Sequence, residues 1–296
     1  MIRTLAILVL AALPCATMAA PAHRGHAKAG VAEVSRDANP FVRSSAALVL
    51  DPTTGETLFA KNADQQAPIA SITKLMTAMV VLDANQPLDE PIEITKDDVD
   101  HVKNTTSRLP IGSHFRRDDL LRLALMASEN RAASALGRNY PGGIEAFVAA
   151  MNEKAKQLGL AQTHYVDSSG LSPENVSSPA DLGKLVAAAS QYELIREFTT
   201  TPAVTVQLPD SRRKLSFINT NGLVRHSDWK IGLSKTGYIS EAGKCLVMQA
   251  MIANQPVVIV LLDSWGRLTR IADANRIRRW LERNSARLLA SRADAE

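Results

Sequence analysis

Ser71 and Lys74 lie three positions apart in the apolar stretch "APIASITKLMTAMVVL", residues 67 to 82. The stretch is predicted to be a helix, and residues at this spacing share one helical face, with Cβ atoms about 5 to 6 Å apart. A serine hydroxyl becomes a strong nucleophile when a neighbouring base removes its proton, and a neutral lysine amine is such a base. The pair therefore predicts a lysine-activated serine nucleophile.

The Ser-x-x-Lys pattern is weak when it is taken alone. It occurs three times in the chain, as Ser71/Lys74, Ser211/Lys214 and Ser227/Lys230. Only the first pair lies at a predicted helix start among apolar residues. Chance therefore remains an open explanation for the pattern by itself.

Two further motifs change this interpretation. The stretch "LMASENRAA" supplies Ser128 and Asn130 directly after a predicted helix, and "LSKTGY" supplies Lys235, Thr236 and Gly237 on a predicted strand. Each motif occurs once, and both follow Ser71 in the order Ser-x-x-Lys, Ser-x-Asn, Lys-Thr-Gly. This ordered triple resembles the signature of the penicillin-recognising serine enzymes, namely the penicillin-binding proteins and the serine β-lactamases.

The chemistry requires an unusual lysine. Lys74 accepts the proton of Ser71 only as a neutral amine, and from a reference pKa of about 10.4 neutrality at pH 7 costs roughly 4 to 5 kcal/mol. We expect burial among Ile69, Leu75 and Met76 to lower the pKa of Lys74, together with a second ammonium, Lys235, across the cleft.

The other motif residues suit the remaining tasks. The Ser128 hydroxyl can relay a proton to the leaving amine, and the Asn130 amide can orient Lys74 and hold the substrate backbone. Lys235 and Thr236 suit a substrate carboxylate, by charge and by hydrogen bond.

Two positions concern the acyl group. Gly237 has no side chain, so an acyl chain can lie along the strand edge as an added strand. The resemblance implies that the backbone N–H groups of Ser71 and Tyr238 form the oxyanion hole, in which one donor typically contributes about 3 to 4 kcal/mol. No cofactor and no metal is predicted, since the histidines show no metal-ligand spacing.

The order of predicted elements indicates the fold class. Residues 44–62 read as a hairpin, residues 232–264 as three strands, and residues 267–289 as a closing helix, with a mostly helical middle. A single antiparallel sheet built from both chain ends, flanked by helices and by a helical subdomain, would place a cleft at their junction. The resemblance implies the same α/β (α+β) architecture, the β-lactamase/transpeptidase-like fold.

The N-terminus has the layout of a secretory signal peptide: Arg3, an apolar run from Leu5 to Leu13, and small residues ending at Ala22. A buried N-terminal helix is the alternative. We expect export to the periplasm and no integral membrane segment after cleavage. The predicted division is a signal peptide at 1–22, a flexible arm at 23–42 and a catalytic domain at 43–290.

Composition excludes several classes of protein. The 296 residues are 46% hydrophobic and 22% charged, as in ordinary globular domains. The net charge is +4, and +3 without Arg3, which is too weak to indicate nucleic-acid binding. Removal of the leader takes Cys15 with it, so Cys245 alone remains and no intramolecular disulfide is expected.

Within the superfamily, residues 40 to 285 resemble the low-molecular-mass D-alanyl-D-alanine peptidases, and most of all the small endopeptidases of the penicillin-binding protein 7 type. The resemblance implies peptidoglycan stem peptides as substrate and β-lactam antibiotics as covalent inhibitors. Only 59 residues follow Gly237, so we expect no C-terminal β-domain.

Several functions stay open. An endopeptidase that hydrolyses D-alanyl cross-links is favoured over a carboxypeptidase that trims pentapeptide, but the motifs do not decide between them. A class A β-lactamase is disfavoured because no glutamate between the second and third motifs begins a Glu-x-x-Leu-Asn segment. A non-catalytic peptidoglycan-binding scaffold is disfavoured because the three motifs are intact.

Overall fold

The structure is a computed structural model that describes residues 39–208 and 213–293, with side chains described to residue 285. The predicted signal peptide and residues 23–38 of the predicted arm lie outside the described residues. Close to the start of the described chain, Val42 is buried, and its carbonyl accepts a hydrogen bond from Lys61 Nζ at 3.2 Å.

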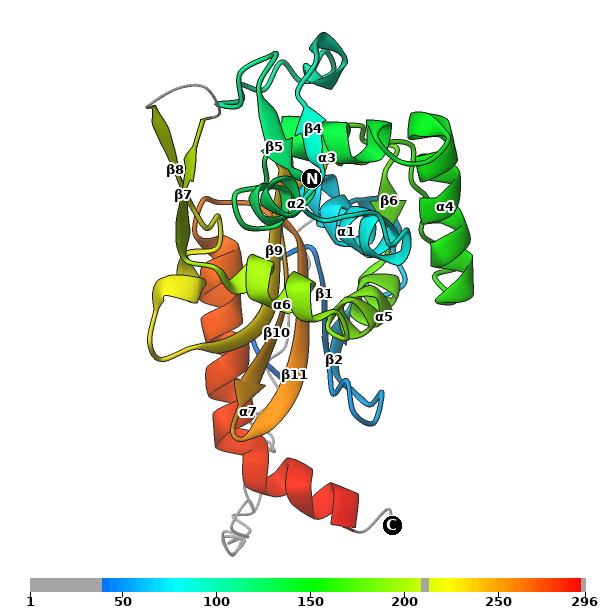
Figure 1. The fold of residues 1–296 in the computed structure, drawn as a ribbon. Coiled ribbons are helices and arrows are strands. Elements are labelled where there is room, and N and C mark those ends of the chain that lie inside the picture. The colour runs from blue at the N-terminus through cyan, green and yellow to red at the C-terminus, as the bar shows by residue number, and fades with distance from the viewer. Residues whose placement is uncertain (1–38, 209–212, 294–296) are drawn as a thin grey trace, which may run out of the picture. The chain divides into compact units, whose positions relative to one another are not determined.

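A five-stranded antiparallel sheet is built from both ends of the chain, as predicted (Figure 1). Its strand order is β2-β1-β11-β10-β9. The strands are β1 (Ala46–Leu50), β2 (Thr57–Lys61), β9 (Lys230–Ile239), β10 (Gly243–Ile252) and β11 (Gln255–Ser264). The central strands are almost continuously apolar because the sheet is covered on both faces.

One face of the sheet packs against α7 (Thr269–Ala293), which lies on β10 and β11. Ile277, Trp280 and Leu281 of the helix are buried against apolar residues of these strands. The helix is also bonded to the residues just before β1. The buried carboxylate of Asp273 accepts hydrogen bonds from the Ser44 N–H and from the Ser44 hydroxyl, both at 2.7 Å.

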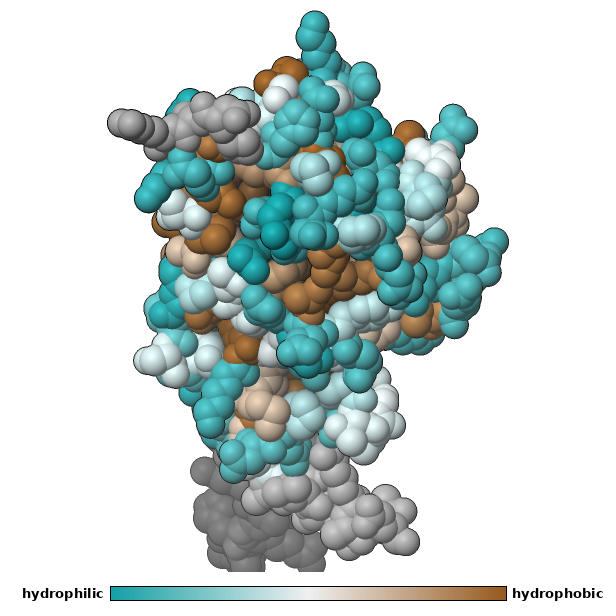
Figure 2. Space-filling model, viewed as in Figure 1, coloured by the Kyte–Doolittle hydropathy of each residue, from teal (hydrophilic) through white to brown (hydrophobic). Residues whose placement is uncertain are grey.

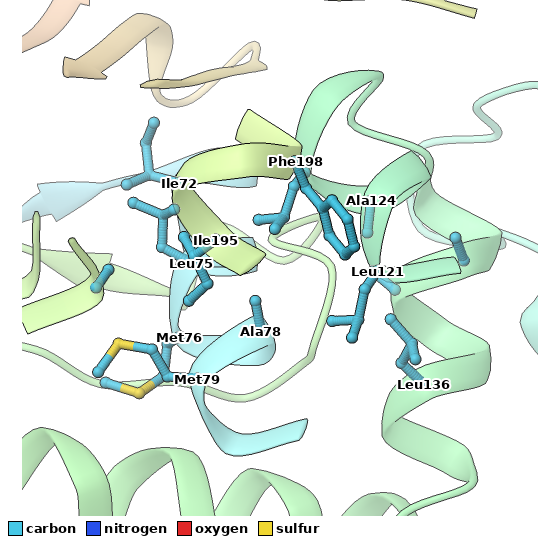
Figure 3. Packing of buried hydrophobic residues seen from close by; sticks show 14 of the residues in the cluster. Ile72, Leu75, Met76, Ala78, Met79, Leu121, Ala124, Leu136, Ile195 and Phe198 are labelled. Carbon is cyan, nitrogen blue, oxygen red and sulfur yellow. The ribbon is translucent and has the colours of Figure 1, made fainter. Parts of the chain in front are cut away.

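The other face carries the helical subdomain. Its helices are α1 (Lys74–Asp83), α2 (Arg117–Met126), α3 (Asn130–Arg138), α4 (Gly143–Gln157), α5 (Pro179–Ala189) and α6 (Glu193–Thr200). Figure 3 shows Leu75 of α1 beside Ile195 of α6, and Ala78 of α1 on the side of the helix toward Leu121 of α2. The helix that carries the predicted base is thus held on several sides by apolar packing.

The middle of the chain is less purely helical than the sequence suggested. It contains three two-stranded antiparallel sheets: β3 (Ala67–Pro68) with β6 (Val176–Ser177), β4 (Pro91–Glu93) with β5 (His114–Arg116), and β7 (Ala203–Gln207) with β8 (Lys214–Ile218). Two 3₁₀ turns also lie there, η2 (Lys96–Asp98) and η3 (Gly222–Arg225).

The stretch 67–82 is not one helix, which corrects the sequence-based expectation. It begins as β3, continues as a 3₁₀ turn, η1 (Ala70–Thr73), and becomes α-helical only at Lys74. The pairing of β3 with a segment more than 100 residues later prevents an earlier helix start.

On the surface seen in Figure 2, hydrophilic residues cover most of the face, and hydrophobic residues show between them near its middle.

Candidate active site

Ser71 lies in η1 and is half-buried. Residues i and i+3 eclipse each other on a 3₁₀ turn, and the Nζ atom of Lys74 lies 2.8 Å from Ser71 Oγ. The turn is entered through Ala70 at φ 48°, a left-handed conformation that costs an alanine energy. The Thr73 hydroxyl donates to the Ala70 carbonyl at 2.8 Å and helps to fix this geometry.

Lys74 is fully buried and has two oxygen acceptors besides Ser71. Its Nζ donates to Asn130 Oδ1 at 2.8 Å and to the Ser169 carbonyl at 2.5 Å. Burial lowers the pKa of Lys74 to about 7, although the negative charges of Asp167, Glu129 and Asp100 oppose this shift. Burial thus lowers the pKa of Lys74 as expected, whereas the expected contribution of Lys235 is not among its causes.

Ser128 lies in the turn between α2 and α3, with a left-handed φ of 59°. Its Oγ accepts a hydrogen bond from Lys235 Nζ at 2.9 Å. Lys235 is itself buried and also donates to the Thr236 carbonyl at 2.8 Å. Burial lowers the pKa of Lys235 well below its ordinary value, and the nearby charges of Lys74 and Arg270 lower it further.

Strand β9 forms the edge of the sheet and lies against η1. A Cβ atom on Gly237 would lie 2.9 Å from the Ile69 carbonyl oxygen and 3.1 Å from the Ser71 nitrogen. The structure thus supplies a second reason for glycine at this position, because the strand must approach the backbone of the nucleophile turn closely.

Tyr238 follows Gly237 and is 61% exposed, with Lys244 Nζ lying 4.4 Å from the centre of its ring. The hydroxyl of Thr236 donates to Thr220 Oγ1 at 2.7 Å. The eight residues selected from the sequence therefore converge at the junction of η1, the α2–α3 turn and β9. Ser227 and Lys230 flank Trp229, which is buried in the α7-side core instead.

Several residues of the site escaped the sequence reasoning. Ser169 contributes only a backbone carbonyl, which no side-chain motif could reveal. Glu129, inside the Ser-x-Asn motif, is buried and accepts a hydrogen bond from Ser107. Thr105 lies 25 residues before Asn130, whose amide donates to it, and Asp100 accepts a hydrogen bond from Thr105, so only the folded chain brings them to the site.

The loop after η2 borders the site. Its Lys103 pairs with Glu241, in the β9–β10 turn, at 2.5 Å. The hydrogen bond from Lys103 lowers the pKa of Glu241 to about 2. The ion pair thus links the helical subdomain to the sheet beside the site.

A cavity of about 280 Å³ opens beside Asn130 and Ser169 and is bordered by Val102, Ile144 and Leu171. A larger hollow of about 420 Å³ lies on α7 and contains no motif residue.

Within residues 39–208 and 213–293, no group of three or more His, Cys, Asp or Glu is arranged to hold a metal ion. No helix in this part of the chain is both long and apolar enough to cross a bilayer.

A family model described as D-alanyl-D-alanine carboxypeptidase matches residues 33–265. The chain belongs to this family of serine peptidases. It is 49% identical over 252 residues to a D-alanyl-D-alanine endopeptidase of Pseudomonas aeruginosa, covering 85% of this chain and 81% of that protein. The resemblance drawn from the three motifs is therefore confirmed.

Solved structures confirm the fold. The Streptomyces K15 DD-transpeptidase superposes with a TM-score of 0.76 at 31% identity, covering 82% of this chain and 98% of that one. Penicillin-binding protein D2 from Listeria monocytogenes, in its cefotaxime-bound form, superposes with a TM-score of 0.72 at 30% identity and the same coverages. The antiparallel sheet with a helical subdomain is the architecture of these penicillin-binding proteins, as predicted.

Proposed function

We propose that this chain is a D-alanyl-D-alanine endopeptidase that hydrolyses the D-alanyl cross-links between peptidoglycan stem peptides through an acyl-enzyme on Ser71. The observation that carries the choice of bond is the 49% identity to an enzyme named as an endopeptidase. The geometry around Lys74 supports the chemical mechanism.

Lys74 is arranged to act as the base. A neutral amine has two N–H donors and one lone pair. The Asn130 amide oxygen and the Ser169 carbonyl accept the two donors. The lone pair is then directed at Ser71 Oγ, where it takes the proton as the oxygen attacks the substrate carbonyl. With a pKa of about 7, the amine is substantially neutral at physiological pH.

Ser128 completes proton transfer. In acylation a bond forms between Ser71 Oγ and the D-alanyl carbonyl carbon, the C–N bond breaks, and the leaving nitrogen needs a proton. The Ser128 hydroxyl, which accepts a hydrogen bond from Lys235, gives its proton to that nitrogen and regains one from the Lys74 ammonium. In deacylation Lys74 takes a proton from the attacking water, the bond between the acyl carbon and Ser71 Oγ breaks, and Lys74 returns the proton to Ser71.

Substrate recognition follows the direction of β9. Lys235 and Thr236 bind the carboxylate of the leaving residue, and the N–H groups of Ser71 and Tyr238 stabilise the oxyanion. The acyl donor therefore extends from Tyr238 toward the β9–β10 turn, where Glu241 lies.

A carboxypeptidase that removes terminal D-alanine is the second candidate. The description of the family favours it, and the leaving groups of both reactions can present a carboxylate to Lys235. The two activities differ in the size of the leaving amine, which only a substrate comparison can decide.

We also propose that β-lactam antibiotics acylate Ser71 and that the protein acts in the periplasm. The Listeria relative in its cefotaxime-bound form supports the first proposal. The signal-peptide layout of residues 1–22 supports the second.

The decisive experiment digests purified cross-linked muropeptides and uncross-linked pentapeptide in parallel and resolves the products by mass. We expect dimers to disappear and monomers to appear, with Ser71→Ala as the inactive control. Release of D-alanine from pentapeptide while dimers stay intact would replace the endopeptidase assignment with the carboxypeptidase one.

A further inference from the structure

A chain of hydrogen bonds runs from the surface loop after η2 to the buried amine of Lys74. The Thr105 hydroxyl donates to Asp100 Oδ2 at 2.6 Å, Asn130 Nδ2 donates to Thr105 Oγ1 at 2.9 Å, and Asn130 Oδ1 accepts from Lys74 at 2.8 Å. Asp100 is half-buried and Thr105 is exposed, whereas Lys74 is fully buried.

The polarity of this chain is fixed at its outer end. An ionised carboxylate only accepts hydrogen bonds, and Asp100 accepts four, from the N–H groups of Val102, Lys103 and Thr105 and from the Thr105 hydroxyl. A hydroxyl has a single hydrogen, so Thr105 Oγ1, having donated to Asp100, only accepts from the Asn130 amide. The amide nitrogen must therefore face Thr105, and the amide oxygen must face Lys74.

The opposite orientation of the Asn130 amide would harm the proposed base. Its oxygen would then face the oxygen of Thr105 with no hydrogen between them. Its NH₂ group would face Lys74 and donate to the lone pair that should be directed at Ser71 Oγ. The orientation of one amide thus decides whether Lys74 is free to take the serine proton.

We propose that Asp100 and Thr105 are positioning residues that hold the Asn130 amide in the orientation the reaction requires. This inference rests on the proposed function, in which Lys74 is the base. Neither residue touches the reacting atoms; both act through Asn130.

Charge adds a second effect that belongs to Asp100 alone. Burial raises the pKa of Asp100, but the hydrogen bonds from Lys103 and Thr105 outweigh burial and lower it, so the carboxylate stays ionised near neutral pH. Its negative charge raises the pKa of Lys74, as do Asp167 and Glu129, and the amine of Lys235 faces Lys74 from β9. Removing the charge of Asp100 should move the titration of Lys74 to lower pH.

The test measures the acylation rate of the whole mature protein with a fluorescent penicillin between pH 5 and 9. Thr105→Val keeps the shape of the side chain but removes the hydroxyl. We expect the maximal acylation rate, reached on the plateau of the pH profile, to fall about ten-fold, the size of one hydrogen bond in a charged network. The acid limb of the profile, where the rate falls at low pH, should not shift. Thr105→Ser should restore the rate. Asp100→Asn should slow the plateau and also move the acid limb to lower pH.

Two surface substitutions serve as matched controls. Thr205→Val removes a hydroxyl that contacts Ser216 on the β7–β8 hairpin, and Asp228→Asn removes a carboxylate that pairs with Arg278. Both should acylate like the wild type. The positioning roles would be overturned if the wild type acylates normally, Thr105→Val acylates at the same rate, and the acid limb of Asp100→Asn does not move. The proposed function would stand in that case. A folded wild type that penicillin does not acylate would overturn the proposed function as well.

Discussion

The two faces of the central sheet bury different kinds of side chain. On the α7 face, apolar residues such as Ile277 and Leu261 pack together, and the buried carboxylate of Asp273 is matched by the donors of Ser44. The opposite face buries two amines, Lys74 and Lys235, and each has a lowered pKa.

This difference separates stability from reactivity. Apolar burial on the α7 face stabilises the fold at every pH. On the reactive face the neutral Lys74 amine costs about 4 to 5 kcal/mol near pH 7 relative to the unfolded chain, and Ala70 and Ser128 add left-handed backbone. The molecule thus maintains a costly site on one side of its sheet through the packing on both sides.

The largest effect is expected at Lys74. Lys74→Met removes the base and should slow acylation by about a thousand-fold, within the range for a general base. Because the pKa of Lys74 is lowered on folding, the buried lysine destabilises the folded protein. This free-energy cost is largest below pH 7 and decreases as the pH rises toward 10.5. Relative to Lys74→Met, the wild type should gain roughly 1.4 kcal/mol of unfolding free energy per pH unit between pH 7 and 10.

Urea unfolding of both proteins at several pH values measures this slope. A stability difference that does not vary with pH would mean that Lys74 stays charged in the folded protein, which would remove it as the base.

A pair of core substitutions sharpens the contrast. Ile277→Ala and Leu75→Ala each remove a fully buried side chain and should each cost about 2 to 5 kcal/mol of unfolding free energy. Leu75 follows the base in α1, so its loss should also slow acylation per folded molecule. Ile277→Ala should leave that rate unchanged, and equal losses of rate in both variants would erase the distinction between the faces.

The smallest effect concerns the ion pair between Lys103 and Glu241. It is partly exposed, so Lys103→Met should change the unfolding free energy by less than about 1 kcal/mol. Because the pair lies where the acyl donor is proposed to run, its loss should change KM for cross-linked muropeptide more than kcat. An effect confined to kcat would mean that Lys103 acts on the chemical step and not on substrate binding.

Sequence reasoning succeeded where the signals are local. Apolar runs between turns located the five strands, a helical stripe located α7, and three short motifs selected the residues that the fold brings together at the candidate site. It missed the break before Ser71 because that depends on the pairing of Ala67 with Ser177. It missed Thr105 and the Ser169 carbonyl because contacts across 25 and 95 residues leave no local pattern.

The most direct test of the account is to map the covalent adduct that the folded protein forms with a labelled penicillin. Peptide mass mapping should place the whole label on Ser71 in the wild type, and folded Ser71→Ala should carry none. Label on Ser211 or Ser227, or label that persists in Ser71→Ala, would contradict the assignment of the nucleophile.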